Sequence, residues 1–175
     1  MPKYSKQSDS ETRAHSEHAD ELRLWLRMLA CTNLVEGHVR TRLRQDFDIT
    51  LPRFDLMAQL ERAPQGMKMG ELSKRMMVTG GNVTGITDQL VEEGLVKRMD
   101  NPTDRRAYIV KLTAKGRKVF TEMAKAHEQW IVELFGGLSL EQRNQLYSLL
   151  AQFKTHATKV ATPPSTKIKR LQETS

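Results

Sequence analysis

Apolar residues recur at helical spacing over the first quarter of the chain. They stand three or four residues apart in most cases, and no proline interrupts them before Pro52. This spacing predicts one long helix over residues 17–48. A helix of about 30 residues is longer than a small domain covers, so its apolar surface is expected to meet another chain. The stripe consists of Leu22, Leu26, Leu29, Val35, Val39, Leu43 and Phe47.

Three shorter helices are predicted next along the chain. The segment "TLPRFDLMAQLERAP" offers Thr50 as an N-cap for the first of them. The second is the short segment "MKMGELSKRMM". In "VTGGNVTGITDQLVEEG", Val83, Ile86 and Leu90 share one helical face in spite of three glycines. We therefore interpret this third stretch as a helix that ends near Gly94, and not as a phosphate-binding loop.

The pattern then changes to two short runs with alternating and β-branched character. These runs, "LVKRM" and "AYIVKLT", flank the turn "DNPTDRR" and predict a β-hairpin with a charged tip. Two helices close the chain. One runs from about Ala114 to Phe135, and the next begins at a capping box formed by Ser139 and Gln142.

The order of these elements predicts a mainly α fold with a small β-hairpin wing. The two short helices before the hairpin have the size of a helix-turn-helix, and the hairpin makes it a winged one. We expect a disordered arm at 1–16, a dimerisation helix at 17–48, a winged helix-turn-helix DNA-binding domain at 49–113, dimerisation helices at 114–158 and a disordered basic tail at 159–175.

The charge of the chain favours a polyanionic partner. Its 175 residues carry a formal net charge of +7, and the sequence pI is about 9.7. Between Lys68 and Lys118 there are 11 lysines and arginines against six aspartates and glutamates. Basic groups on a helix-turn-helix neutralise phosphates and make DNA binding depend on salt. A basic architectural protein with little sequence preference would show the same charge.

The sequence gives little support to catalysis. "GGNVTG" lacks the Gly-Lys-Ser/Thr ending of a phosphate-binding loop, and the five histidines show no metal spacing. We expect no enzyme activity, no cofactor and no metal. The one cysteine, Cys31, cannot form an internal disulfide, and neither a signal core nor 18 consecutive apolar residues is present. These features predict a soluble cytoplasmic protein without a membrane partner.

The central segment resembles the winged-helix core of the multiple antibiotic resistance regulator (MarR) family. The parts that carry the resemblance are "NVTGITDQLVEEGLVKR", the wing "DRRAYIVKLT" and the T-x-x-G motif at Thr113–Gly116. With the flanking helices it covers roughly residues 18–156. It implies a homodimer joined through the first and last helices, in which each recognition helix enters a major groove of a pseudo-palindromic double-stranded DNA operator. It further implies a ligand-responsive transcriptional regulator, and we expect a repressor.

Candidate DNA contacts follow from this resemblance and from side-chain chemistry. Asn82, Thr84 and Gln89 are expected on the exposed side of the recognition helix, where they suit base edges or phosphates. The glycines at the start of this helix are expected to serve a turn and a close backbone approach. The resemblance implies that Arg106 reaches a minor groove and that Asp104 braces it. The full set is Ser73, Lys74, Arg75, Thr79, Gly81, Asn82, Thr84, Gly85, Gln89, Asp104, Arg105 and Arg106.

The resemblance also implies an effector that releases the DNA. Family members often bind a small anionic aromatic ligand between the dimer helices and the winged domain. "LPRFDLMAQL" is similar to members that govern aromatic-acid degradation, so we expect an aromatic acid or its coenzyme A thioester. The candidate ligand contacts are His38, Arg40, Arg53, Phe54, Met57 and Trp130, of which Phe54 and Met57 equally suit a core.

A redox switch at Cys31, as in the peroxide-sensing branch of the family, is an alternative to a ligand. Cys31 stands in the middle of a predicted helix among apolar neighbours. We therefore interpret it as a core residue.

Overall fold

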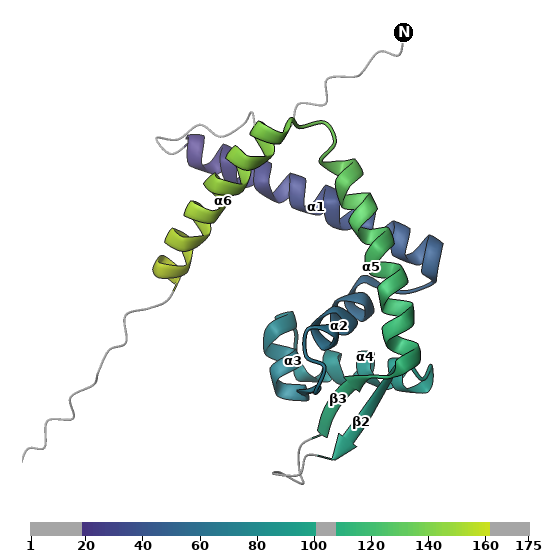
Figure 1. The fold of residues 1–175 in the computed structure, drawn as a ribbon. Helices are drawn as coiled ribbons and strands as arrows, with labels where there is room; N and C mark the ends of the chain where they lie inside the picture. Colours follow the sequence, from purple (N-terminus) through teal and green to yellow (C-terminus); the bar gives the residue numbers. More distant parts are fainter. Residues whose placement is uncertain (1–18, 101–107, 162–175) are drawn as a thin grey trace, which may run out of the picture. The chain divides into compact units, whose positions relative to one another are not determined.

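The structure of the protein, a computed structural model, describes residues 19–100 and 108–161 (Figure 1). Within these ranges the elements follow in the order α1, α2, β1, α3, α4, β2, β3, α5 and α6. The predicted mainly α fold with a small hairpin wing is confirmed. The expected arm at 1–16 and the part of the expected tail from residue 162 onward lie outside the described residues.

The chain divides into two compact units, Met1–Ile131 and Val132–Ser175. The first unit holds the winged domain, and Figure 1 shows α2, α3 and α4 gathered beside β2 and β3. The second unit contains the last residues of α5 and all of α6. None of the helices in the described ranges combines the length and the apolar character needed to cross a membrane.

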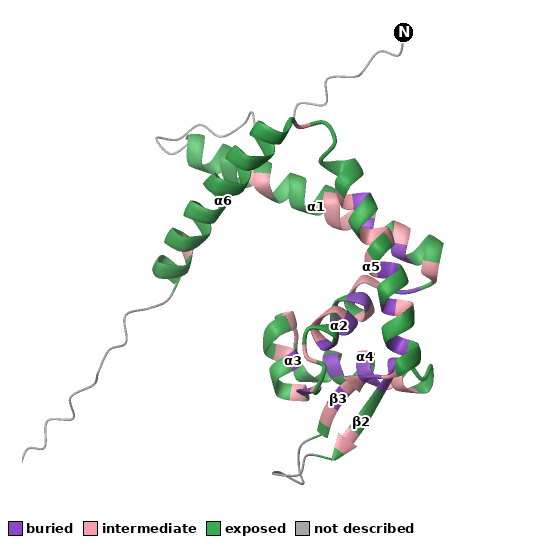
Figure 2. Ribbon diagram, in the orientation of Figure 1, coloured by how far each residue is buried: buried purple, intermediate pink, exposed green. Residues whose placement is uncertain are grey.

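Helix α1 spans Ala19–Phe47, and only its C-terminal part belongs to the core. Val39 and Leu43 are its buried residues, whereas Trp25 is 54% exposed and Leu34 is 73% exposed. Most of the first half of α1 is exposed (Figure 2). Its 29 residues extend over about 43 Å, which is more than the core of its unit can cover. The interpretation of Cys31 as a core residue is therefore wrong for the single chain, because this thiol lies on the exposed half of α1.

Helix α2 spans Leu51–Glu61 and begins after Thr50, as predicted. Thr50 caps it through the backbone, because its carbonyl accepts from the amides of Arg53 at 3.1 Å and Phe54 at 3.0 Å. Its side chain makes no capping hydrogen bond. A proline in the first turn fits, since the amide that it lacks would have no partner within the helix.

The sheet has three antiparallel strands in the order β1-β3-β2. Strands β2 (Val96–Asp100) and β3 (Tyr108–Leu112) form the predicted hairpin. Strand β1, Met67–Lys68, was not predicted and pairs with β3 through Met67 and Val110. Two residues are too few to show an alternating pattern, so only the partner strand reveals β1.

The core of the first unit lies where α2, α3, α4 and α5 meet the sheet. Helix α3 spans Met69–Met76, α4 spans Gly80–Glu92 and α5 spans Ala114–Leu134. Their buried apolar faces follow the predicted helical spacing. The completely or almost completely buried members of this core include Leu43, Leu56, Met57, Leu60, Leu72, Val83, Leu90, Val110 and Met123.

The T-x-x-G motif joins α5 to the end of α4. The Thr113 hydroxyl donates to the carbonyl of Gly94 at 2.7 Å and accepts from the amide of Gly116 at 2.9 Å. A Cβ atom at Gly116 would lie 1.9 Å from the carbonyl oxygen of Leu95. This position therefore requires glycine, because the backbone of another segment occupies the space of a side chain.

Helix α6, Leu140–Ala161, forms the main part of the second unit. The predicted capping box is confirmed: the Ser139 amide donates to Gln142 Oε1 at 2.8 Å, and the Gln142 amide donates to Ser139 Oγ at 3.2 Å. The helix ends three residues later than the predicted boundary at 158. It has no buried residue, and Figure 2 shows it exposed along almost its whole length. Tyr147, for example, is 76% exposed.

Candidate nucleic-acid interface

The turn between α3 and α4 is closed by hydrogen bonds of its own backbone and of Ser73. Met77 adopts a left-handed conformation with φ 54°, and its amide donates to the Lys74 carbonyl at 3.3 Å. The Val78 amide donates to the Ser73 carbonyl, while Ser73 Oγ donates to the Val78 carbonyl at 2.6 Å. Ser73 therefore uses its only hydroxyl proton to fix the turn, which leaves it lone pairs alone for a further partner.

The glycines of α4 do not serve this turn. In the described residues the positive φ angles of glycine occur at Gly66 and Gly94, and those of other residues at Asp48 and Met77. A Cβ atom at Gly80, Gly81 or Gly85 would meet nothing within 4 Å. The expectation that glycine is needed to form the turn at the start of α4 is wrong, because the left-handed residue is Met77. Because Gly80, Gly81 and Gly85 have no side chains, part of the surface of α4 carries only backbone.

The exposed side of α4 carries the polar residues that the sequence predicted there. Asn82, Thr84 and Gln89 are exposed, while Val83 and Leu90 are fully buried. Thr84 Oγ1 donates to the Gly80 carbonyl at 3.0 Å, so its hydroxyl has lone pairs but no free proton for an outside partner. Thr79 is the N-cap, and its side chain accepts from the Asn82 amide at 3.5 Å. These are hydrogen-bonding side chains on a solvent-facing helix.

Thr87 is a buried polar residue that sequence analysis missed. It is completely buried, and its hydroxyl donates to the Val83 carbonyl at 2.7 Å. The bond satisfies the hydroxyl within the helix, so threonine can take the place of an apolar residue on the inner face of α4. Its position four residues after Val83 and three before Leu90, on the buried face, was the available signal.

Part of the positive charge around α4 is already paired. Arg98 on β2 forms an ion pair with Asp88 on α4, and Arg75 pairs with Glu71 at 2.7 Å within α3. Lys74 and Lys97 are exposed. The charge count from sequence therefore overstates the number of cations that can contact a phosphate, because some of them would first have to break an ion pair within the protein.

The tip of the wing lies outside the described residues. This applies to Asp104, Arg105 and Arg106, whose expected roles in DNA binding stay predictions. The strands that lead to the tip are described, and they end at Asp100 and begin again at Tyr108.

An aromatic cluster connects α1, α2 and α5. The ring of Phe54 lies 5.5 Å from that of Phe120 and 5.2 Å from that of His127, between ring centroids. His127 also lies 6.4 Å from Trp130, and the guanidinium of Arg42 lies 5.2 Å from the Trp130 centroid. Of the predicted ligand contacts, Phe54 and Trp130 thus belong to one cluster. His127 was missed, because nothing in sequence relates it to Phe54.

The other predicted ligand contacts have different surroundings. Met57 is completely buried in the core. Arg40 is exposed and pairs with Glu36 within α1. Arg53 pairs with Glu93, and His38 Nε2 is buried without a hydrogen-bond partner among the described residues. Only part of the expected ligand set therefore lies together.

Two titratable groups at this cluster have shifted pKa values. Burial lowers the pKa of His127 from its ordinary value of 6.5, and the nearby Asp55 carboxylate opposes that shift. Asp55 as a whole is exposed, yet desolvation of its carboxyl raises its pKa, and Glu36 raises it further. The His127 imidazole is therefore more easily kept neutral than a histidine in water.

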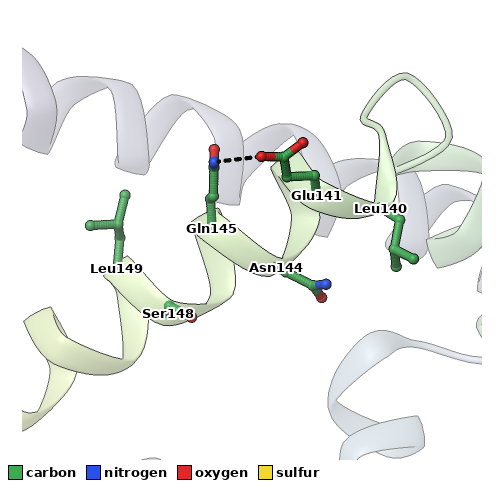
Figure 3. Close-up of a pocket in the computed structure, with 6 residues that line it drawn as sticks. All are labelled: Leu140, Glu141, Asn144, Gln145, Ser148 and Leu149. Carbon is green, nitrogen blue, oxygen red and sulfur yellow. Dashed lines mark hydrogen bonds between the residues drawn. The ribbon is translucent and has the colours of Figure 1, made fainter.

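A hollow of about 800 Å³ follows the surface of α6. Figure 3 shows that the side chains lining it come from α6 alone, with Gln145 Nε2 donating to Glu141 Oε1 at 3.4 Å. Leu140 and Leu149 contribute its apolar part. A surface lined by one helix does not enclose a small molecule, so we do not assign a ligand to it.

Comparison with known proteins points to one family. The model of the MarR family matches residues 49–108. The uncharacterized HTH-type transcriptional regulator YkoM of Bacillus subtilis (strain 168) is 32% identical over 96 residues, which cover 55% of this chain and 61% of that protein. The match therefore spans less than two thirds of this curated relative.

Solved structures extend the likeness over most of the chain. The crystal structure of a MarR family transcriptional regulator from Silicibacter pomeroyi is 30% identical, with a TM-score of 0.69, and the match covers 82% of this chain and 99% of that one. Sco3205, a MarR family transcriptional regulator from Streptomyces coelicolor solved in complex with DNA, is 24% identical, with a TM-score of 0.70 and coverage of 81% and 89%. The latter likeness concerns the fold alone.

Proposed function

Since this chain belongs to the MarR family, we propose that it is a transcriptional regulator that binds double-stranded DNA through α4 and the wing. The observation that carries this proposal is the exposed polar face of α4, with Asn82, Thr84 and Gln89 beside three positions that lack side chains. A helix with such a face fits a major groove and offers donors and acceptors to base edges. The fold relative Sco3205, solved with DNA, supports the same use of the fold.

The residues around α4 divide into two roles under this proposal. Asn82, Thr84 and Gln89 read bases or contact phosphates, and Gly81 and Gly85 allow the helix to approach the groove closely. Contacts to the DNA backbone come from the turn and from the wing, where Arg106 enters a minor groove with Asp104 beside it. These backbone contacts are assigned to Ser73, Lys74, Arg75, Thr79 and Arg105.

The proposed active form is a homodimer. Support comes from the exposed apolar residues on α1 and α6, such as Trp25, Leu34 and Tyr147, which no other part of the described chain buries. Exposed apolar surface of this extent marks an interface between proteins. Two-fold symmetry would place the two α4 helices against half-sites one DNA turn apart, so the operator would be pseudo-palindromic.

The proposed regulator is a repressor that a small anionic aromatic acid or its coenzyme A thioester releases from DNA. His38 Nε2 is buried without a hydrogen-bond partner in the described part of the chain, and Arg42, one helical turn later and paired with Asp46, lies over Trp130. A buried polar atom without a partner and a cation over an aromatic ring suit a flat anion. The effector would favour a spacing of the two α4 helices that fails to match successive grooves.

Two alternatives stay open beside this proposal. One is a basic architectural protein that binds any duplex. The other is a redox-responsive repressor, and the exposure of the Cys31 thiol favours access for an oxidant.

Selection of duplexes from a random library, followed by salt-titrated binding, tests the main proposal. A regulator should enrich an inverted repeat and bind it at least about 10³-fold more tightly than random duplex. Equal affinity for both duplexes would contradict the proposal and favour the architectural alternative. An effector identified by thermal-shift screening of aromatic acids and their coenzyme A thioesters should lower DNA affinity, because coupling between two sites is reciprocal. Loss of DNA binding on oxidation, absent in Cys31→Ser, would favour the redox alternative.

A further inference from the structure

The end of α4 is held by two cations from two other helices. Arg53 of α2 forms an ion pair with the carboxylate of Glu93, and Lys115 Nζ of α5 donates to the carbonyl of the same residue at 2.8 Å. Glu93 is the C-cap of α4, and Gly94 then turns the chain with φ 69°. Positive groups at this place also complement the negative end of the helix dipole. The C-terminus of the recognition helix is therefore attached to α2 and α5.

The carboxylate of Glu93 is the main polar partner of the Arg53 guanidinium among the described residues. The Arg53 side chain is only 11% exposed, and its Nε atom is buried without a hydrogen-bond partner among the described residues. Removing the acid would leave a cation that is shielded from water and poorly paired. Glu93 is 46% exposed, so the pair is partly screened and its contribution to folding stability is modest. The ion pair between Arg53 and Glu93 is therefore better suited to orienting α4 than to stabilising the fold.

We infer that Arg53 and Glu93 are positioning residues for DNA recognition, which fix the angle at which α4 projects its exposed polar face. This inference rests on the proposed function. Arg53 belongs to α2 and is not part of that face. Glu93 stands at the end of α4, four residues after Gln89 and on the same side of the helix, and its carboxylate pairs with Arg53. The pair therefore acts on the distant contact at Asn82 through the helix itself.

The length of α4 explains why a contact at one end matters at the other. Asn82 stands 11 residues before Glu93, a distance of about 16 Å along a helix. A tilt of about 10° around the C-terminal end would move Asn82 by about 3 Å. Hydrogen bonds to base edges tolerate only a few tenths of an ångström. A small change at Glu93 would therefore disturb base contacts, whereas contacts to phosphates by flexible lysines would adapt.

The test compares the affinity of the full-length protein for two labelled duplexes of equal length. One duplex is selected from a random library by the unaltered protein, and the other has random sequence. Glu93→Gln should lower the ratio of the two affinities by about tenfold, the usual effect of losing one good base contact. Glu92→Gln is the matched control, since it removes the same charge from the exposed neighbour. It should leave the ratio within about twofold.

A double-mutant cycle separates a joint role from two independent ones. Arg53→Met should lower the ratio as Glu93→Gln does, and the double variant should be no worse than either single variant. All measurements are made where circular dichroism shows each variant to be folded. If Glu93→Gln does not fold, Arg53→Lys replaces it, because it keeps the cation and loses the guanidinium geometry.

The outcomes distinguish the inference from the proposed function. If the unaltered protein prefers no duplex over random sequence, the proposed function and the positioning inference are both contradicted. If it has a preference that folded Glu93→Gln or Arg53→Lys retains in full, only the positioning inference is overturned. A loss that Glu92→Gln shows equally would also overturn it, because the effect would then be one of net charge.

Discussion

At the scale of single residues, glycine has three different uses in this chain. Gly66 and Gly94 have positive φ angles that other residues adopt at a cost. Gly116 has an ordinary conformation, but its neighbour leaves no room for a side chain. Gly85 has neither restriction within the folded protein. Under the proposed function, Gly85 serves the close approach of α4 to DNA.

The substitution Gly116→Ala should destabilise the protein by about 2–3 kcal/mol, because the new Cβ would lie 1.9 Å from the Leu95 carbonyl oxygen. Urea unfolding followed by circular dichroism measures this change. Gly70→Ala is the control, since a Cβ there would meet nothing within 4 Å. Equal stability of the two variants would show that the approach of α5 to Leu95 is looser than the structure indicates.

Two substitutions at Gly85 separate folding from DNA binding. Gly85→Ala should stabilise the free protein by about 0.5–1 kcal/mol, because alanine loses less conformational freedom in a helix. Gly85→Leu should also fold, since a Cβ there has open space, but should weaken specific DNA binding at least tenfold by covering the part of the α4 surface that carries only backbone. Gly37→Leu on α1 is the matched control, and its Cβ likewise meets nothing. Undiminished DNA binding by Gly85→Leu would remove this position from the interface.

The lowered pKa of His127 predicts how stability depends on pH. The unfolded chain takes up the proton near pH 6.5, while the folded protein resists it, so the free energy of unfolding should fall as the pH drops below 6.5. The raised pKa of Asp55 acts in the opposite direction, because the folded protein retains that proton as the pH rises above 3.8. Urea unfolding at about pH 7.5 and about pH 5.5 measures the histidine contribution. His127→Gln should reduce this difference, and an unchanged difference would assign it to other groups.

At the scale of elements, the turn between α3 and α4 holds Met77 in a left-handed backbone conformation that methionine does not favour. Met77 has φ 54° and is 93% exposed, so packing against the described residues offsets little of the cost of the left-handed backbone. The Ser73 hydroxyl and two backbone amides hold the turn instead. The entry of α4 is thus fixed by hydrogen bonds, and its exit is fixed at Glu93 by two cations.

The substitution Met77→Gly should raise the free energy of unfolding by about 1 kcal/mol, because glycine adopts positive φ without steric cost. Chemical denaturation measures it, with Met76→Gly in the preceding helix as a control that should lower stability. A loss of stability in Met77→Gly would mean that the methionine side chain makes a favourable contact in the folded protein.

At the scale of the whole molecule, exposed apolar side chains are concentrated on the first half of α1 and on α6. The winged domain has a core of its own, whereas α6 has no buried residue. A single chain therefore leaves much of its terminal helices without cover. This imbalance is the physical reason for expecting a second copy.

Dimerisation is tested by Leu149→Glu, which replaces a leucine that is 63% exposed in the single chain with a charged residue. The variant should dissociate at concentrations where the unaltered protein is dimeric, because burying the carboxylate in an apolar interface costs free energy. Sedimentation velocity measures the state of association. Ser148→Glu adds the same charge at the neighbouring position and should change it less. A monomeric unaltered protein would contradict the proposed dimer directly.

The periodicity of apolar residues by itself determined most of the elements, because an amphipathic helix or strand repeats its apolar residues along one side. Local chemistry determined the capping box of α6 and the N-cap position of α2. The face of α4 also followed from sequence, since Val83, Ile86 and Leu90 fix which side is turned inward.

Tertiary structure alone decided which distant residues meet. Strand β1 exists only because β3 lies beside it, and Gly116 is required only because Leu95 approaches it. The ion pair between Arg53 and Glu93 and the aromatic contact between Phe54 and His127 join positions far apart in the chain. A pattern within one segment reports which side is buried but not against what, so these contacts depend on how the helices pack.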